Sequence, residues 1–176
     1  IITVGCNLKL IGFNIIIAHE KASCIWKKLM TKNPILIDSQ DYETLCIFQG
    51  KPTPNKELTE EYNPLESGLW DAISFNKGCY IGQETIARLN TYKGVKQKLW
   101  GIKLNGFIDP EKDNIIMVGE KKVGKITSYI ESDSENFALG YIKTKIGDIG
   151  LKVTIGETEG EVVNLPFIRH EYYQPQ

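Results

Sequence analysis

The second half of the chain carries six short β-rich segments in close succession, and this pattern limits the fold more than any other feature. Val, Ile, Thr and aromatic side chains favour strands, and Gly, Asn and Asp separate one segment from the next. Short strands at such spacing are typical of a compact antiparallel barrel or sandwich. The predicted strands are residues 97–104, 115–119, 122–130, 137–143, 151–155 and 160–163, with a hairpin turn within residues 118–123.

The first half of the chain mixes predicted strand and helix. Residues 11–18 are rich in β-branched side chains and predict a buried strand. Apolar side chains at helical spacing predict a helix over residues 21–30. Residues 51–64 contain three prolines and several charges, which predicts an irregular connection at the surface.

A second helix is predicted over residues 40–49. Asp38 or Ser39 can cap its first turn, because a short polar side chain accepts hydrogen bonds from free N–H groups there. Gly50 closes it, since glycine adopts the left-handed conformation that ends many helices.

Length and composition bound the class of protein. The chain has 176 residues and a net charge of −1, with 41% hydrophobic and 24% charged residues, an ordinary mixture for a globular protein. The longest apolar run is too short to span a bilayer, and no signal peptide is visible. We expect an α+β chain of two domains, residues 1–95 and a small antiparallel β-barrel at 96–176. The chain begins at Ile1 within an apolar stretch, and we expect it to be a fragment.

Four cysteines are spread along the chain and form no CxxC pair. Metal sites built on cysteine usually need such close pairs, so no metal site is expected. The absence of a secretion signal favours a reducing compartment. The four are Cys6, Cys24, Cys46 and Cys79.

The chemically informative segment is Lys77-Gly-Cys-Tyr-Ile-Gly-Gln-Glu84. It follows a predicted strand at 72–75 and precedes a predicted helix at 83–90. A glycine-containing turn before a helix exposes backbone N–H groups and the positive end of the helix dipole. A cation and a helix N-terminus both stabilise thiolate over thiol, so Cys79, beside Lys77, is the best placed of the four cysteines to react. The alternative is a small cysteine that packs in the core.

This octapeptide is the signature of the YgfZ branch of the YgfZ/GcvT folate-binding family, which the chain resembles from about Tyr42 onward. The similarity extends to the flanking segments and to the β-rich half. The matching segments are Glu57-Leu-Thr, Asn63-Pro-Leu-Glu, Ala72-Ile-Ser-Phe, Ile86-Ala-Arg-Leu, Leu99-Trp-Gly-Ile, Val123-Gly-Lys-Ile-Thr-Ser, Ala138-Leu-Gly-Tyr and Leu165-Pro-Phe167.

The resemblance implies a three-part folate-binding scaffold related to the aminomethyltransferase of glycine cleavage. This chain would hold the end of the central folate-binding part and the C-terminal barrel. The resemblance further implies tetrahydrofolate as cofactor and iron–sulfur enzymes or cluster-assembly proteins as partners, with an indirect link to thiolated tRNA. The expected role is an accessory protein for assembly or repair of iron–sulfur enzymes, in a bacterial cytosol or an organelle matrix. The motif itself assigns no catalysed reaction.

The resemblance also suggests roles within the motif. Cys79 would be a reactive or ligand-contacting thiol, with Lys77 as its electrostatic activator. Arg88 would orient an anionic group of the ligand. Tyr80 either stacks on the ligand or anchors the turn, and Gln83 either contacts the ligand or caps the helix.

One departure from the family pattern concerns the acid that faces the pterin. Family members usually read Leu-Arg-Ile-Glu where this chain has Cys46 and Phe48. A carboxylate can pair with two adjacent N–H donors in a way that a phenyl ring cannot. Glu66 and Glu84 are the remaining candidates, although Glu84 can equally stabilise the helix N-terminus.

Two other functions stay open. One is a folate-dependent aminomethyl or one-carbon transferase of the glycine-cleavage type. The other is an RNA-interacting module, since residues 85–108 hold five basic side chains and no acidic one. The plain alternative for these basic residues is a solvated surface. They are Arg88, Lys93, Lys96, Lys98 and Lys103.

Overall fold

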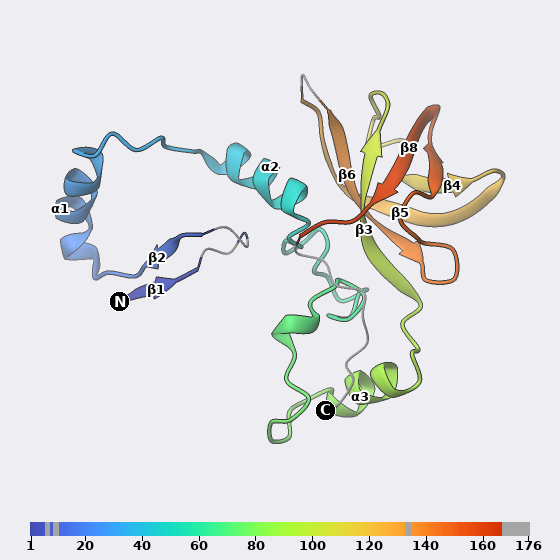
Figure 1. Ribbon diagram of the computed structural model, residues 1–176, viewed down its shortest axis with the longest axis horizontal. Coiled ribbons are helices and arrows are strands. Elements are labelled where there is room, and N and C mark those ends of the chain that lie inside the picture. Colours follow the sequence, from blue (N-terminus) through green and yellow to red (C-terminus); the bar gives the residue numbers. More distant parts are fainter. Residues whose placement is uncertain (6–7, 9–10, 133–134, 167–176) are drawn as a thin grey trace. The chain divides into compact units, whose positions relative to one another are not determined.

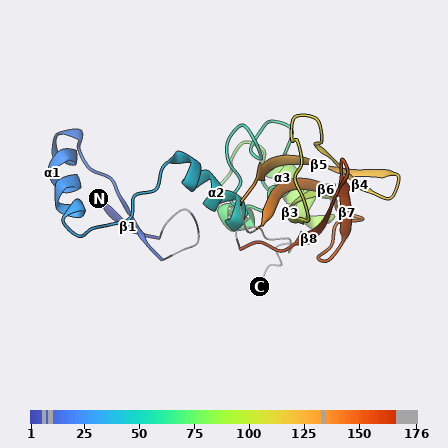
Figure 2. The ribbon, with the colours of Figure 1, turned by 90° about the horizontal axis from the view of Figure 1, so that it is seen from above.

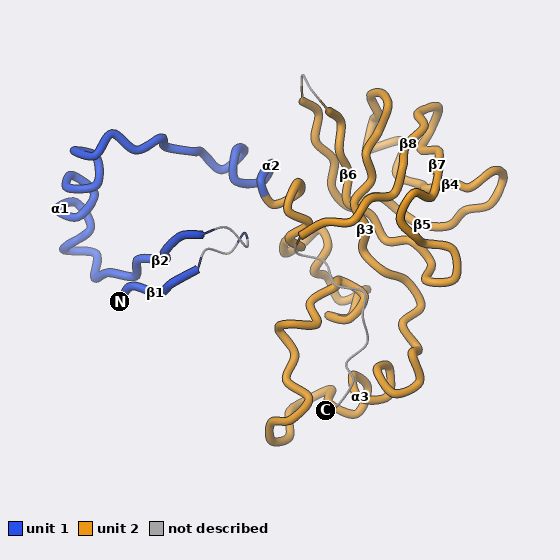
Figure 3. The backbone as a smooth tube through the Cα atoms, viewed as in Figure 1, with its two compact units in different colours: residues 1–45 blue, residues 46–176 orange. Residues whose placement is uncertain are grey.

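The computed structural model of the chain describes residues 1–5, 8, 11–132 and 135–166. Cys6 and Phe167 therefore lie outside the described residues. The chain forms two compact units, residues 1–45 and residues 46–176 (Figure 3). Among the described residues, none of the helices has the length and apolar character needed to cross a membrane.

Six strands of the second unit close into an antiparallel barrel in the order β3-β6-β5-β4-β7-β8 (Figures 1 and 2). Each strand coincides with a predicted segment to within two residues at either end, so the barrel prediction is confirmed. The β4–β5 hairpin turns at Gly119 and Glu120, as predicted. The strands are β3 (Gln97–Leu104), β4 (Ile115–Val118), β5 (Lys121–Ile130), β6 (Asn136–Lys143), β7 (Lys152–Ile155) and β8 (Thr158–Val163).

The barrel interior is filled by aliphatic side chains from all six strands, among them Ile102, Ile116 and Ile142, each fully buried. Closure of a small barrel brings backbones close together. A Cβ on Gly124 would lie 2.1 Å from the carbonyl oxygen of Tyr141, so this position accepts only glycine without a shift of the strand.

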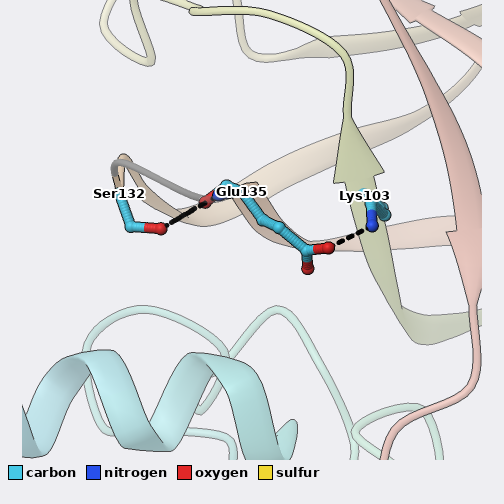
Figure 4. A network of polar contacts seen from close by, with 3 residues as sticks. All are labelled: Lys103, Ser132 and Glu135. Atoms are coloured by element: carbon cyan, nitrogen blue, oxygen red, sulfur yellow. Dashed lines mark hydrogen bonds and ion pairs between the residues drawn. The ribbon is translucent and has the colours of Figure 1, made fainter.

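Polar contacts connect β3 to the residues that directly precede β6 (Figure 4). Lys103 on β3 forms an ion pair with Glu135, which directly precedes β6. The hydroxyl of Ser132 donates to the carbonyl oxygen of Glu135 and accepts from its N–H. These contacts hold the end of the β5–β6 connection against the neighbouring strand.

The first unit contains a two-stranded antiparallel sheet and a helix. β1 (Ile2–Val4) pairs with β2 (Phe13–Ile15), and α1 spans His19–Met30. The helix prediction for 21–30 is confirmed. The buried strand predicted over 11–18 is wrong, because only β2 is a strand and its side chains are exposed or half-buried. Two strands alone have no second layer to cover their faces.

Helix α2 (Ser39–Gln49) begins and ends as its sequence predicts. The Asp41 N–H donates to Oδ1 of Asp38 (2.8 Å), and the Asp38 N–H donates back to the Asp41 carboxylate (3.2 Å), a reciprocal cap. At the other end Gly50 has φ +70° and its N–H donates to the carbonyl of Ile47. Lys51 N–H donates to the carbonyl of Cys46, which completes a Schellman motif.

Between α2 and the barrel, the chain is irregular apart from a 3-10 turn at Trp70–Ala72 and helix α3 (Gln83–Thr91). The helix prediction for 83–90 is confirmed, but the strand predicted at 72–75 is wrong. Ile73 and Phe75 instead pack on a small apolar cluster that includes Trp70 and Ile86. Within the described residues, no strand pairs with this segment. Its two apolar side chains are therefore covered by this cluster and not by a sheet.

Candidate functional site

The turn that opens α3 borders a pocket of about 400 Å³. One wall is apolar and is formed by Ile73, Ile81 and Ile86, and Lys77 and Tyr80 of the motif also line it. A pocket of mainly apolar lining with a few polar groups is the usual form of a small-molecule site. The motif therefore brings a cavity and chemically active side chains together.

Within the motif, Lys77 and Tyr80 contact each other and Cys79 is exposed. The Lys77 ammonium lies 4.9 Å from the centroid of the Tyr80 ring, a cation–π arrangement. Cys79 is a free thiol at the surface, which removes the alternative of a packed core cysteine. A reagent or ligand can therefore reach its sulfur.

Gly82 determines the direction in which α3 leaves the turn. Its φ of +87° is a left-handed conformation that suits glycine. The Gln83 N–H donates to the carbonyl oxygen of Tyr80 (3.2 Å), which closes the turn. Glu84 and Arg88 are exposed and lie four residues apart, so both project from the same solvent face of the helix.

Glu66 is separate from this turn. Its carboxylate accepts the N–H of Asn63 (3.2 Å), and the Asn63 side chain accepts the N–H of Glu66 (3.1 Å), which is a capping-box arrangement. Gln97 adds further hydrogen bonds, and burial raises the pKa of Glu66 above its ordinary value. Glu66 lines another pocket, of about 460 Å³, together with Lys96 and Gln97.

Of the two residues at the position of the usual family acid, one is buried and the other is half-buried against the barrel. Cys46 is buried with 1% of its surface exposed. Phe48 packs on Phe137 of β6, with ring centroids 5.5 Å apart. The side chain of Phe48 is thus committed to the contact between α2 and the barrel.

Sequence reasoning missed a buried carboxylate, Glu57. The connection at 51–64 was predicted to lie at the surface, yet Glu57 has no exposed area. Its Oε2 accepts both the N–H and the hydroxyl of Thr53, each at 3.0 Å. Its Oε1 accepts the hydroxyls of Thr127 (2.7 Å) and Ser128 (2.6 Å). The only sequence signal was the short Glu57-Leu-Thr match, which names no partner.

Within the described residues, no group of three or more His, Cys, Asp or Glu side chains converges to hold an ion. The chemistry available at the motif is that of one exposed thiol, one ammonium group and one aromatic ring beside a pocket.

Comparison with solved structures defines the class of fold. The crystal structure of the glycine cleavage system aminomethyltransferase T from Bartonella henselae matches with a TM-score of 0.79, covering 98% of this chain and 51% of that one, at 19% identity. The chain therefore has the aminomethyltransferase fold, an α+β structure ending in a closed six-stranded barrel.

Sequence comparison gives the relatives themselves. Over 172 residues the chain is 44% identical to a chloroplastic protein of Arabidopsis thaliana that is provisionally named a transferase, covering 96% of this chain and 39% of that protein. It is 29% identical over 170 residues to the aminomethyltransferase of Halothermothrix orenii, covering 90% of this chain and 47% of that protein. The chain spans less than half the length of these relatives. No model of a known protein family matches it.

Proposed function

We propose that this chain is part of a folate-binding accessory protein that supports assembly or repair of iron–sulfur enzymes, and thereby tRNA modification. The observation that carries the proposal is the exposed Cys79 in a turn whose Lys77 and Tyr80 line a pocket. Residues 1–95 would form the end of the folate-binding domain and residues 96–176 the barrel domain. The Arabidopsis relative favours an organelle matrix, with a bacterial cytosol as the other candidate compartment.

The residues present fit part of a folate. Tyr80 offers an aromatic face for a pterin or benzoyl ring, and Ile73, Ile81 and Ile86 add apolar lining to the pocket. Tetrahydrofolate would supply a carrier for one-carbon groups. Because the carboxylate of Glu66 is held in a capping box, Glu84 is the better candidate for pairing with pterin N–H groups. Arg88, on the same helix face, would bind a carboxylate of the ligand.

Complementation tests the role of the thiol. In a strain that lacks its native copy, a full-length protein with Cys79→Ser should fail to restore iron–sulfur enzyme activities. Cys24→Ser is the matched control, because Cys24 is also an exposed free thiol but lies in the first unit, outside the motif. Full restoration by Cys79→Ser would remove the accessory role assigned to this thiol.

The second candidate is a folate-dependent aminomethyl or one-carbon transferase. It is favoured by the names of the bacterial relatives, which are aminomethyltransferases. Turnover of an aminomethyl-carrying protein with tetrahydrofolate discriminates between the two, because only the transferase predicts it.

A further inference from the structure

A third pocket, of about 370 Å³, is lined by the segment before the motif, by Pro110 and Asn114, and by strand β5 of the barrel. It shares no residue with the pocket at the Cys79 turn, so a ligand bound here does not depend on the proposed function. Its volume lies in the range of small-molecule sites. Its lining is mostly polar and includes Asn55, Lys56, Thr59, Glu61, Tyr62, Asn114, Lys125 and Thr127.

The buried carboxylate of Glu57 fixes the two walls of this pocket relative to each other. It accepts two hydrogen bonds from Thr53, in the loop that carries one wall, and two from Thr127 and Ser128 on β5. A carboxylate has about four lone-pair sites, so all of them are filled. The side chain of Glu57 is thus fully hydrogen-bonded and joins the loop of Thr53 to β5.

A β-bulge presents Thr127 to the pocket. The pairing of β5 with β6 shifts register between Ile126 and Ser128, which leaves Thr127 as the additional residue. Its single hydroxyl proton is directed inward, to Glu57 at 2.7 Å, with the carbonyl of Leu139 as a longer second acceptor at 3.2 Å. Toward the pocket the Thr127 oxygen can therefore only accept a hydrogen bond.

The pocket consequently offers two different kinds of partner. Thr127 and the carboxylate of Glu61 are acceptors, which suit a ligand N–H donor with positive charge. Lys56 and Lys125 are cations, which suit a carboxylate. A ligand with only a negative charge would leave the two acceptors without a donor. A ligand with only a positive charge would be repelled by the two lysines.

From this arrangement we propose that the pocket binds a small zwitterion of the α-amino acid class. The ligand ammonium group contacts Glu61 and Thr127. The ligand carboxylate contacts Lys125 and Lys56.

Backbone amide NMR of the 176-residue chain tests the proposal with three matched probes: L-alanine, propionate without the ammonium group, and ethylamine without the carboxylate. At constant ionic strength, L-alanine should cause saturable shifts at Ile126 and Thr127, and the other two probes should bind at least about tenfold more weakly. Shifts that do not saturate, or equal binding of propionate, overturn the proposal.

Variants test the residue assignment. Lys125→Gln and Glu61→Gln should each weaken L-alanine binding at least about tenfold, and both side chains are exposed, so the fold should survive. Lys121→Gln is the control, because it lies on the same strand but does not line the pocket. Unchanged binding in both pocket variants, with the rest of the spectrum intact, overturns the assignment.

Discussion

Tyr62 lies flat on Tyr141 of the barrel, with ring centroids 3.7 Å apart and ring planes 13° from parallel. The Tyr141 hydroxyl donates to the main-chain carbonyl of Glu57 at 2.8 Å and contacts the Ser67 hydroxyl at 2.7 Å. Burial raises the pKa of Tyr141, so it stays neutral at physiological pH. One barrel side chain thus fixes three positions of the segment that precedes the motif.

Tyr141→Phe should therefore destabilise the protein while preserving the ring stacking. The substitution leaves the buried carbonyl of Glu57 without its donor, and such an unsatisfied group costs about 1–3 kcal/mol. Denaturant unfolding measures the loss. Tyr92→Phe is the control, because Tyr92 is 77% exposed and its substitution should change the unfolding free energy by less than about 0.5 kcal/mol. Equal stabilities of the two variants would contradict the role of the hydroxyl.

Gly124→Ala should strain the barrel. The added methyl group would lie 2.1 Å from the carbonyl oxygen of Tyr141, and the backbone of β5 must move to relieve the clash. Overpacking of this kind costs about 1–3 kcal/mol or more, measurable as a lower unfolding temperature. Gly106→Ala is the comparison, since its methyl group would meet only Thr158 at an ordinary 3.5 Å. A barrel that tolerates both substitutions equally would not have the β5–β6 register described.

The barrel was predictable because its information is local. Each strand is a short β-rich segment that ends at its own turn, as at Gly119 between β4 and β5. The segment at 72–75 is also short and apolar but forms no strand, since strand formation depends on a partner that the segment itself does not encode. Ile73 and Phe75 instead pack on the apolar cluster that contains Trp70 and Ile86.

The candidate site likewise has one part that the sequence predicts and one part that it does not. The turn around Cys79 was predictable because a contiguous motif contains its glycines, its cation and the helix that follows. The burial of Glu57 was not predictable, because its partners Thr127 and Ser128 are 70 and 71 residues away. A charged residue in a proline-rich connection ordinarily indicates exposure.

Glu66 should make stability depend on pH. Burial raises its pKa above the ordinary value of 4.5, so the folded state binds the proton more tightly than the unfolded state. Stability from this group is therefore greatest below the unfolded pKa and falls as pH rises through the folded pKa. Glu66→Gln retains a side chain that suits a capping box but does not titrate. Its stability relative to the parent should increase between about pH 4 and neutrality, roughly the range in which carboxyl groups titrate. Urea unfolding across this range measures the difference in unfolding free energy between Glu66→Gln and the parent. A difference that stays constant with pH would refute the prediction.

The thiols should differ in reactivity according to their exposure. Cys79 and Cys24 are exposed, whereas Cys46 is buried. Iodoacetamide should therefore alkylate Cys79 and Cys24 in the native protein, and Cys46 only after unfolding. Mass spectrometry of the labelled peptides gives the three rates. If the turn binds folate, saturating tetrahydrofolate should slow the labelling of Cys79 and leave that of Cys24 unchanged. Labelling of Cys46 at the rate of Cys79 in the native state would contradict the packing of α2.

Phe48→Glu, which places the usual family acid at its position, should not create a folate site. Phe48 packs on Phe137 in a cluster with Leu139 and Leu165, so a carboxylate there loses aromatic packing and must be desolvated or displaced. A destabilisation below the roughly 3–5 kcal/mol of aromatic truncations in cores is expected, because Phe48 is half-buried.

Phe48→Leu is the control for that substitution, since it keeps an apolar side chain and should cost less. Calorimetric titration of tetrahydrofolate into the full-length parent and both variants gives the answer. Equal binding by the parent and Phe48→Leu, with weaker binding by Phe48→Glu, would mean that the pterin is held elsewhere, with Glu84 the next residue to test. Folate binding that appears only in Phe48→Glu would show instead that this position faces the ligand, and would contradict the packing of Phe48 on Phe137.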